Sequence, residues 1–235
     1  MEGSKIKLQH WVIAIYMATT NLKGISSMKL SRELGITQKS AWYMLQRIRE
    51  AFDEGDGLLR GTVEVDETYM GGKRKNMHNA KRKTLKGRGA TDKAIVVGMK
   101  CRDSKEIRAK TAEDTTAYTL HKFIAENMDP EATLITDDNR AYMQLYKRYD
   151  HRAVRHSTSE FVRGMAHTNG IESFWALLKR GYHGTYHHIS KKHLNRYVQE
   201  FAGRFNIREL DTIRQMAFVA KRMEGKRLKY EELVS

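Results

Sequence analysis

Apolar residues in the first fifty positions recur at helical spacing in three short blocks. Residues 8–22 predict one amphipathic helix. The next block ends at Gly35, a common helix terminator, and Thr37 is a favoured N-cap for the block that follows it. Helix, glycine turn and capped second helix form the helix-turn-helix pattern of DNA-binding proteins, and a plain helical hairpin is the alternative. Polar residues suited to phosphates and base edges are expected on the exposed side of the second helix: Gln38, Lys39, Ser40, Gln46, Arg47 and Arg49.

Beyond a turn-rich joint at residues 52–60, the pattern changes to short strands and helices. Strands are predicted within 61–72 and at 93–101, 106–111, 132–136 and 152–156. Helices are predicted at 115–127 and 140–149, from 169 onward, and at 190–205 and 212–223. This order predicts an α/β fold with a mixed sheet and a helix-rich end.

The first predicted strand, GTVEVDETYMGG, is unusually acidic. Glu64, Asp66 and Glu67 lie among apolar residues at alternate positions, so carboxylates point to both faces of the strand. Burying an unpaired carboxylate is costly. Either at least one of these residues is held for a purpose such as metal binding, or the segment is an edge strand with a solvated acidic face.

Two further acidic residues lie at informative places. Asp137 follows the apolar strand ATLIT, and Glu172 lies in the first turn of the helix NGIESFWALLKRG. Carboxylates at a strand centre, a strand end and a helix start can converge on one edge of a sheet. Such a cluster would repel itself without a divalent cation, and all-oxygen ligation favours Mg²⁺ or Mn²⁺. For Glu172 alone, a solvated helix face is the more common arrangement.

The composition predicts a polyanionic partner. The chain has 43 Lys+Arg against 28 Asp+Glu and a formal charge of +15, which favours nucleic acid over a membrane surface. No apolar run approaches the roughly 18–20 residues that span a bilayer, no signal peptide is recognised, and a single cysteine, Cys101, indicates a reducing cytoplasm. Residues 72–91 contain no acidic residue and predict either a mobile loop along a phosphate backbone or a merely solvated one. Its cations are Lys73, Arg74, Lys75, Lys81, Arg82, Lys83, Lys86 and Arg88.

Three strings carry a family resemblance: GTVEVDETYMGGK, LITDDNRAY and HTNGIESFWALLKRGYHGTYHHISKKHLNRYVQEFAGRFNIR. They resemble bacterial insertion-sequence transposases that have an RNase H-like DDE core behind a helix-turn-helix, and the resemblance extends from about Trp11 to about Arg208. The separation of 35 positions between Asp137 and Glu172 fits the DDE spacing. The resemblance implies that Asp66, Asp137 and Glu172 are the metal-binding triad. Asp137 is preferred over Asp138 because it matches the Thr-Asp of the family motif.

The resemblance also implies an architecture and an activity. We expect a helix-turn-helix domain at residues 1–55, an RNase H-like mixed sheet flanked by helices at 60–208, and a C-terminal helical tail at 209–235. The implied activity is cleavage at insertion-sequence ends and transfer of the 3′-OH into target DNA, with two Mg²⁺ or Mn²⁺ ions. Lys179, seven residues after Glu172 on the same helix face, and Arg180 are expected to hold phosphates. Double-stranded DNA, a homo-oligomer on that DNA, no membrane and a cytoplasmic, nucleoid-associated location follow as expectations.

Two alternatives and one departure accompany this hypothesis. The same triad would serve a simple RNase H-like nuclease, and a catalytically inactive helix-turn-helix regulator derived from a transposase is the other alternative. Members of the group often carry an N-terminal zinc ribbon built from paired cysteines, which Cys101 alone cannot form. We therefore expect either a shorter relative or a reading frame that has lost that module. His183, His187 and His188 either contact DNA, assist proton transfer or are ordinary surface residues, and Trp175 is predicted to be helix packing.

Overall fold

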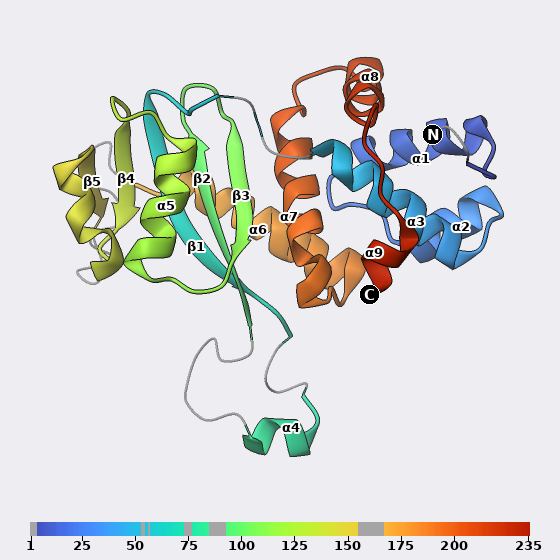
Figure 1. Ribbon diagram of the computed structural model, residues 1–235, viewed down its shortest axis with the longest axis horizontal. Helices are drawn as coiled ribbons and strands as arrows, with labels where there is room; N and C mark the ends of the chain where they lie inside the picture. Colours follow the sequence, from blue (N-terminus) through green and yellow to red (C-terminus); the bar gives the residue numbers. More distant parts are fainter. Residues whose placement is uncertain (1–3, 53–54, 56, 73–76, 85–92, 155–166) are drawn as a thin grey trace.

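Five strands form one mixed sheet in the order β3-β2-β1-β4-β5 (Figure 1). The computed structural model describes residues 4–52, 55, 57–72, 77–84, 93–154 and 167–235. The strands are β1 Thr62–Met70, β2 Ala94–Cys101, β3 Ile107–Ala112, β4 Thr133–Asp137 and β5 Asp150–Val154. β1, β2 and β3 pair antiparallel, whereas β4 runs parallel to β1 and β5 parallel to β4. This order and these directions make the fold RNase H-like, which confirms the predicted α/β class.

Helices cover both faces of the sheet. One face packs against α5 (Ala117–Asn127) and the 3₁₀ helix η3 (Arg140–Lys147), and the other packs against α6 (Asn169–Gly181) and α7 (Lys191–Asn206). On β1, Val63 and Val65 pack with α5, whereas Met70 packs with α6. Because successive strand residues point to opposite faces, the acidic residues of β1 divide in the same way. Glu64 and Asp66 contact α6, and Glu67 contacts η3.

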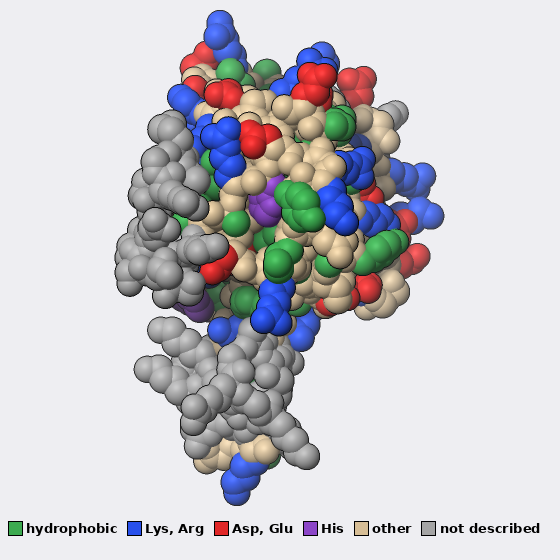
Figure 2. Space-filling model, turned by 90° about the vertical axis from the view of Figure 1, so that its left-hand side faces the viewer, with side chains coloured by type: hydrophobic (Ala, Val, Ile, Leu, Met, Phe, Trp, Pro, Cys, Tyr) green, Lys and Arg blue, Asp and Glu red, His purple; other side chains and the backbone are tan. Residues whose placement is uncertain are grey.

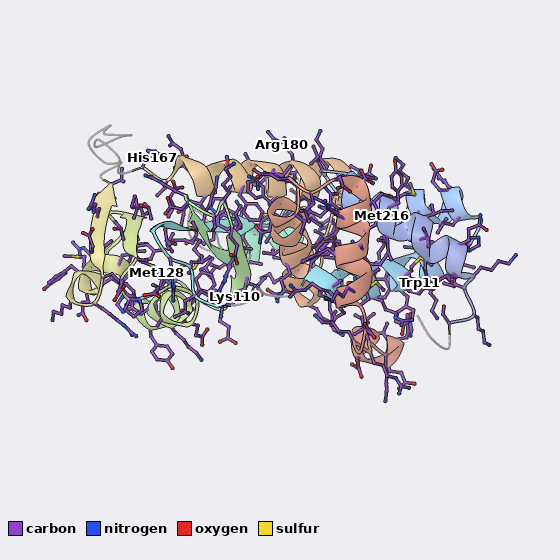
Figure 3. All side chains as sticks on the ribbon, turned by 90° about the horizontal axis from the view of Figure 1, so that it is seen from above. Trp11, Lys110, Met128, His167, Arg180 and Met216 are labelled. Atoms are coloured by element: carbon purple, nitrogen blue, oxygen red, sulfur yellow. The ribbon has the colours of Figure 1, made fainter. Side chains whose placement is uncertain are left out.

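The other half of the molecule is helical. Its elements are α1 Leu8–Thr20, α2 Ser27–Leu34, α3 Gln38–Arg49, η1 Glu50–Phe52, η5 Tyr182–Tyr186, α8 Thr212–Arg222 and α9 Tyr230–Val234. The core of this half is formed by α1, α2 and α3, and Val219 of α8 and Met223 just after it add to this core. Seen from above in Figure 3, α6 runs from the sheet toward these helices. His167 lies just before its start, and Arg180 lies near its end.

The turn between α2 and α3 follows from local chemistry. Gly35 ends α2 with φ +62, a left-handed conformation that costs glycine little. Ser26 and Thr37 cap the two helices by accepting from the backbone N–H groups of Lys29 and Ser40. The predicted helix, glycine turn and capped second helix are therefore all present.

The prediction for the face of α3 is wrong at two residues. Gln46 is fully buried, and Arg49 is buried in an ion pair, with its Nε 2.6 Å from Glu200 Oε2 on α7. Arg204 also pairs with Glu200, so one buried carboxylate holds two guanidinium groups where α3 meets α7. Neither Gln46 nor Arg49 is available to DNA in this arrangement. The burial of Arg49 was not predicted because α7, which carries Glu200, begins more than 140 positions later.

Two further segments refine the predicted elements. The last strand covers Asp150–Val154 and so begins two residues earlier than predicted. The basic segment between β1 and β2 contains a short helix, α4 (Asn79–Thr84), which stands away from the sheet in Figure 1. Lys73, Arg74, Lys75, Lys86 and Arg88 lie outside the described residues. In the part of the chain that the structure describes, no helix is long and apolar enough to cross a membrane.

Candidate active site

The two aspartates predicted as metal ligands come from adjacent parallel strands. Thr62–Glu64 of β1 pair with Thr133–Ile135 of β4. Asp66 and Asp137 each lie two residues beyond that pairing. They therefore come close to each other at the end of the sheet where β4 stops. The pKa of Asp66 is raised to about 7, first by burial, then by the negative charge of Glu67 and, more weakly, by that of Asp137. The strand pair thus creates a place where negative charge is disfavoured.

Trp175 on α6 fixes the Asp66 carboxylate. Its Nε1–H donates to Asp66 Oδ2 at 2.9 Å, and the indole is buried. Gly98 of β2, the register partner of Asp66, makes room for the indole, because a Cβ at Gly98 would lie 2.5 Å from Trp175 Cη2. Trp175 is therefore more than the helix packing that its position in the sequence predicted. A glycine inside the strand AIVVGMKC was the available signal for such a close approach.

Glu67 is held on the opposite face of β1. Tyr142 Oη donates to Glu67 Oε2 at 2.5 Å, and Asn139 Nδ2 donates to Glu67 Oε1 at 3.0 Å. Burial raises the pKa of Glu67, the hydrogen bond from Tyr142 opposes that rise, and the charge of Asp137 adds to it. The backbone N–H of Asn139 also donates to Asp137 Oδ1 at 3.1 Å. Residues just after β4 therefore orient Asp137 and Glu67 together.

Glu172 lies beside these aspartates without joining them. Its side chain is exposed in the first turn of α6, and its Oε1 accepts from Thr168 Oγ1 at 2.9 Å. Among the described residues, no group of three His, Cys, Asp or Glu side chains is placed to hold a metal ion. However, Glu172 precedes Trp175 by three residues, so both project from neighbouring positions on α6. The structure brings Asp66 and Asp137 together and leaves Glu172 turned toward its own helix.

The oxygen donors fit a hard divalent cation. Asp66 and Asp137 are carboxylates, the ligand type that Mg²⁺ and Mn²⁺ prefer. A cation between them would offset the cost of burying negative charge and the repulsion between carboxylates, which together raise the pKa of Asp66. Glu172 would complete the set after a rotation of its side chain away from Thr168.

Basic residues lie along the exposed side of α6. Lys179 and Arg180 are both exposed, and Arg180 lies on the outer side of the helix in Figure 3. Lys83 is exposed on α4, while the side chains of Lys81 and Arg82 are outside the described set. The end of the molecule near β5 differs, because Figure 2 shows its Lys and Arg side chains scattered among acidic and apolar ones. On α6, by contrast, cations follow Glu172 along one helix.

The residues predicted to contact DNA from α3 are only partly exposed. Gln38 and Lys39 are exposed, whereas Ser40 and Arg47 are half-buried. Lys39 lies over the Tyr230 ring of α9, and Tyr43 Oη donates to the carbonyl oxygen of Leu228 at 2.5 Å. The C-terminal segment thus packs along α3. The three histidines left open by the sequence, His183, His187 and His188, are all exposed.

Comparison with known proteins identifies the family. A family model described as the ISXO2-like transposase domain matches residues 58–206, well over half of the chain. The chain belongs to the ISXO2-like transposase family. The matched region begins just before β1 and ends with α7, so it contains Asp66, Asp137 and Glu172. The predicted relationship to insertion-sequence transposases is confirmed.

Two individual proteins are similar to this chain. The chain is 28% identical over 209 residues to a Halobacterium salinarum protein described as an uncharacterized protein in transposable element ISH50, covering 85% of this chain and 70% of the relative. Among solved structures, it is similar to a chain in the simian T-cell lymphotropic virus intasome in complex with PP2A regulatory subunit B56 gamma. That similarity has 16% identity and a TM-score of 0.36, and it covers 79% of this chain and 66% of that chain. The fold assignment rests on the sheet topology alone, because this score is low.

The raised pKa of Asp66 predicts a pH-dependent effect of Asp66→Asn. Because the folded-state pKa of about 7 lies above the usual value of 3.8, ionisation of Asp66 opposes folding as pH rises between these values. In EDTA, Asp66→Asn should therefore melt above wild type at pH 8, with a gap that shrinks toward pH 4. Thermal unfolding followed by circular dichroism from pH 4 to 8 measures this, with the exposed Glu33→Gln as the matched control. Parallel curves for wild type and Asp66→Asn would contradict the described environment.

The fit of Trp175 against β2 predicts that Gly98→Ala is destabilising. The added Cβ would lie 2.5 Å from the indole and push it from Asp66, so we expect a loss of about 1–3 kcal/mol. Urea unfolding gives the loss, and tryptophan fluorescence of the folded variant reports the displaced indole. Gly72→Ala, whose Cβ would meet nothing within 4 Å, is the control. Equal unfolding midpoints for the two variants would refute the proposed fit.

Proposed function

We propose that this transposase cuts DNA at the ends of an insertion sequence and joins the freed 3′-OH to target DNA. One observation carries the proposal: Asp66 and Asp137 meet at the edge of an RNase H-like sheet in a chain of a transposase family. Two carboxylates on neighbouring parallel strands, with a third one on an adjacent helix, suit metal-assisted phosphoryl transfer on a polyanionic substrate.

Each site residue has a role in this proposal. Asp66, Asp137 and Glu172 would hold two Mg²⁺ or Mn²⁺ ions, which would supply an activated oxygen nucleophile and stabilise the leaving oxygen. Trp175 Nε1–H holds one oxygen of Asp66 in a fixed orientation, and the backbone N–H of Asn139 does the same for Asp137. Asp66 and Asp137 are thus preorganised, which lowers the cost of binding a cation.

Among the three proposed metal ligands, Glu172 is the one whose side chain must rotate to reach a cation. Its contact with Thr168 is a partly buried hydrogen bond, worth about 0.5–1.5 kcal/mol. Attraction to a divalent cation beside Asp66 exceeds that value even with solvent screening, because two opposite unit charges 4 Å apart gain about 4 kcal/mol near a protein surface. We therefore propose that Glu172 turns from Thr168 to the cation when the site is loaded.

Double-stranded DNA would approach along α6. Lys179 and Arg180 follow Glu172 on the exposed side of that helix, where they would contact phosphates on either side of the cut. The basic segment between β1 and β2 would add phosphate contacts, and Gln38, Lys39, Ser40 and Arg47 are the proposed contacts from α3. Joining two transposon ends in one reaction requires at least two sites, so we propose a homo-oligomer on DNA.

Two other functions are outcomes of the same assay. A simple nuclease would hydrolyse DNA without joining it, and an inactive regulator would bind DNA without cutting it. The orientation of Glu172 toward Thr168 is the feature that favours the regulator. Incubation of DNA flanking the gene, with pre-cut 3′ ends and Mg²⁺ or Mn²⁺, separates the three functions. Joined products support the transposase, and their absence would overturn it.

Asp66→Asn should abolish cleavage while leaving DNA binding intact. Loss of the Asp66 charge would remove one of the proposed metal ligands, and we expect cleavage to fall by about 10³-fold or more. DNA affinity measured by fluorescence anisotropy should remain within a few-fold, because the phosphate contacts lie elsewhere. Glu126→Gln, which removes an exposed carboxylate from α5, is the matched control. Cleavage by Asp66→Asn at the wild-type rate would rule out this metal site.

The double substitution Lys179→Ala and Arg180→Ala should weaken DNA binding and its salt dependence together. If each cation contacts one phosphate, the slope of log K against log[salt] should become shallower by about 2. The measurement is a salt titration of DNA affinity. The control is Lys122→Ala with Lys147→Ala, which removes two exposed cations from the face covered by α5 and η3. Identical slopes for the two double variants would contradict the DNA path along α6.

A further inference from the structure

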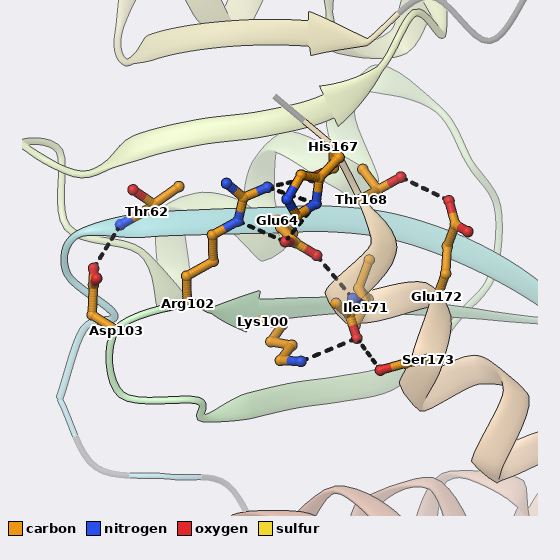
Figure 4. A network of polar contacts seen from close by, with 11 residues as sticks. Thr62, Glu64, Lys100, Arg102, Asp103, His167, Thr168, Ile171, Glu172 and Ser173 are labelled. Carbon is orange, nitrogen blue, oxygen red and sulfur yellow. Dashed lines mark hydrogen bonds and ion pairs between the residues drawn. The ribbon is translucent and has the colours of Figure 1, made fainter. Parts of the chain in front are cut away.

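The start of α6 is capped from a neighbouring strand rather than by its own N-cap residue. The first N–H groups of any helix lack partners within that helix. Thr168 occupies the N-cap position but makes no capping bond, because its hydroxyl donates to Glu172. Instead, Glu64 Oε2 on β1 accepts from the backbone N–H of Ile171 at 2.9 Å (Figure 4). A strand carboxylate therefore takes the place of the usual cap.

Other side chains of the sheet hold the same short segment. The second oxygen of Glu64 lies 2.7 Å from Arg102 Nε, and Arg102 Nη2 donates to the carbonyl oxygen of His167 at 2.6 Å. Lys100 Nζ donates to the carbonyl oxygen of Gly170 at 3.3 Å. Figure 4 shows these groups converging on residues 167–171 from β1 and β2. The backbone just before Glu172 is thus fixed at three points.

Glu64 is buried, so its negative charge needs groups that offset the cost of burial. Glu64 is 1% exposed, and a buried carboxylate costs several kcal/mol unless it is paired. Arg102 and the positive end of α6 supply that compensation. Gly170 permits the approach, because a Cβ there would lie 2.6 Å from Glu64 Oε2. Charge, hydrogen bonding and the lack of a side chain at residue 170 all allow the contact between Glu64 and the backbone N–H of Ile171.

This contact controls where Glu172 lies relative to Asp66. Glu64 and Asp66 are two residues apart and face α6 together, so β1 holds a fixed distance between them. Glu64 accepts a hydrogen bond from α6 at Ile171, and Asp66 accepts one at Trp175, one turn later. Glu172 lies between these two attachment points. Its backbone position is therefore set by the same strand that carries Asp66.

We propose that Glu64 is a positioning residue, which caps α6 from β1 so that Glu172 can reach a divalent cation at Asp66. This inference rests on the proposed function. Glu64 itself does not touch the cation. A glutamine at residue 64 replaces one of the two carboxylate oxygens with an NH2 group, so a donor would then face either Arg102 Nε or the backbone N–H of Ile171.

The test measures Mn²⁺ binding to the DNA-free full-length chain by isothermal titration calorimetry. We expect Glu64→Gln to weaken Mn²⁺ binding by at least ~10-fold, and hydrogen exchange of the Ile171 amide to become faster, because an exchange-protecting partner is lost. Glu200→Gln is the matched control, since it removes another carboxylate that is 1% exposed and paired with arginine, but at the α3–α7 contact. It should lower stability and leave Mn²⁺ affinity within about 2-fold of wild type.

Gly170→Ala provides a second variant that retains every charge. Its Cβ would displace the Glu64 carboxylate, so it should weaken Mn²⁺ binding in the same direction, and it decides the matter if Glu64→Gln does not fold. Wild-type affinity in a folded Glu64→Gln, or in Gly170→Ala if the former is unfolded, would overturn this inference alone. A wild-type protein that binds no Mn²⁺ and cuts no DNA would overturn the proposed function and this inference with it.

Discussion

The central constraint in this protein is that one buried strand carries acidic side chains on both of its faces. β1 lies in the middle of the sheet, and alternation sends Glu64 and Asp66 to α6 and Glu67 to η3. A carboxylate in such surroundings needs a compensating group. Much of the local structure supplies one: an arginine and a helix N-terminus for Glu64, an indole for Asp66, and a tyrosine and an asparagine for Glu67.

The groups that offset the buried negative charge differ between Glu64 and Asp66, and this difference indicates which of the two is functional. Glu64 has a full positive charge beside it, whereas Asp66 has hydrogen bonds from the indole N–H and the backbone of Glu67 together with two acidic neighbours. Burial, followed by the negative charges of Glu67 and Asp137, raises the pKa of Asp66 to about 7. Perturbed groups of this kind cluster at functional sites, although structural ion pairs also perturb pKa values. Asp66 is thus the acidic residue of β1 whose charge is best balanced by something outside the protein, such as a divalent cation.

Sequence patterns predicted the elements better than the contacts between them. The alternation in β1, the glycine turn at Gly35 with its cap Thr37, and the apolar spacing of α6 are local signals, and the structure contains the corresponding elements. Long-range partners leave no such signal. Arg49 meets Glu200 from 151 positions away, so its burial was not predictable from α3. Trp175 meets Asp66 from 109 positions away, so an aromatic residue that looked like packing turned out to hold the key carboxylate.

The family and the RNase H-like topology place this chain among transposases, and the metal site is the claim on which its proposed chemistry depends. The most direct measurement is anomalous X-ray diffraction from crystals of the protein grown with Mn²⁺. We expect an anomalous peak between the carboxylates of Asp66 and Asp137, with the side chain of Glu172 turned away from Thr168 and toward the ion. An Asp66–Asp137 edge without a peak at saturating Mn²⁺, with Glu172 still bonded to Thr168, would contradict this expectation.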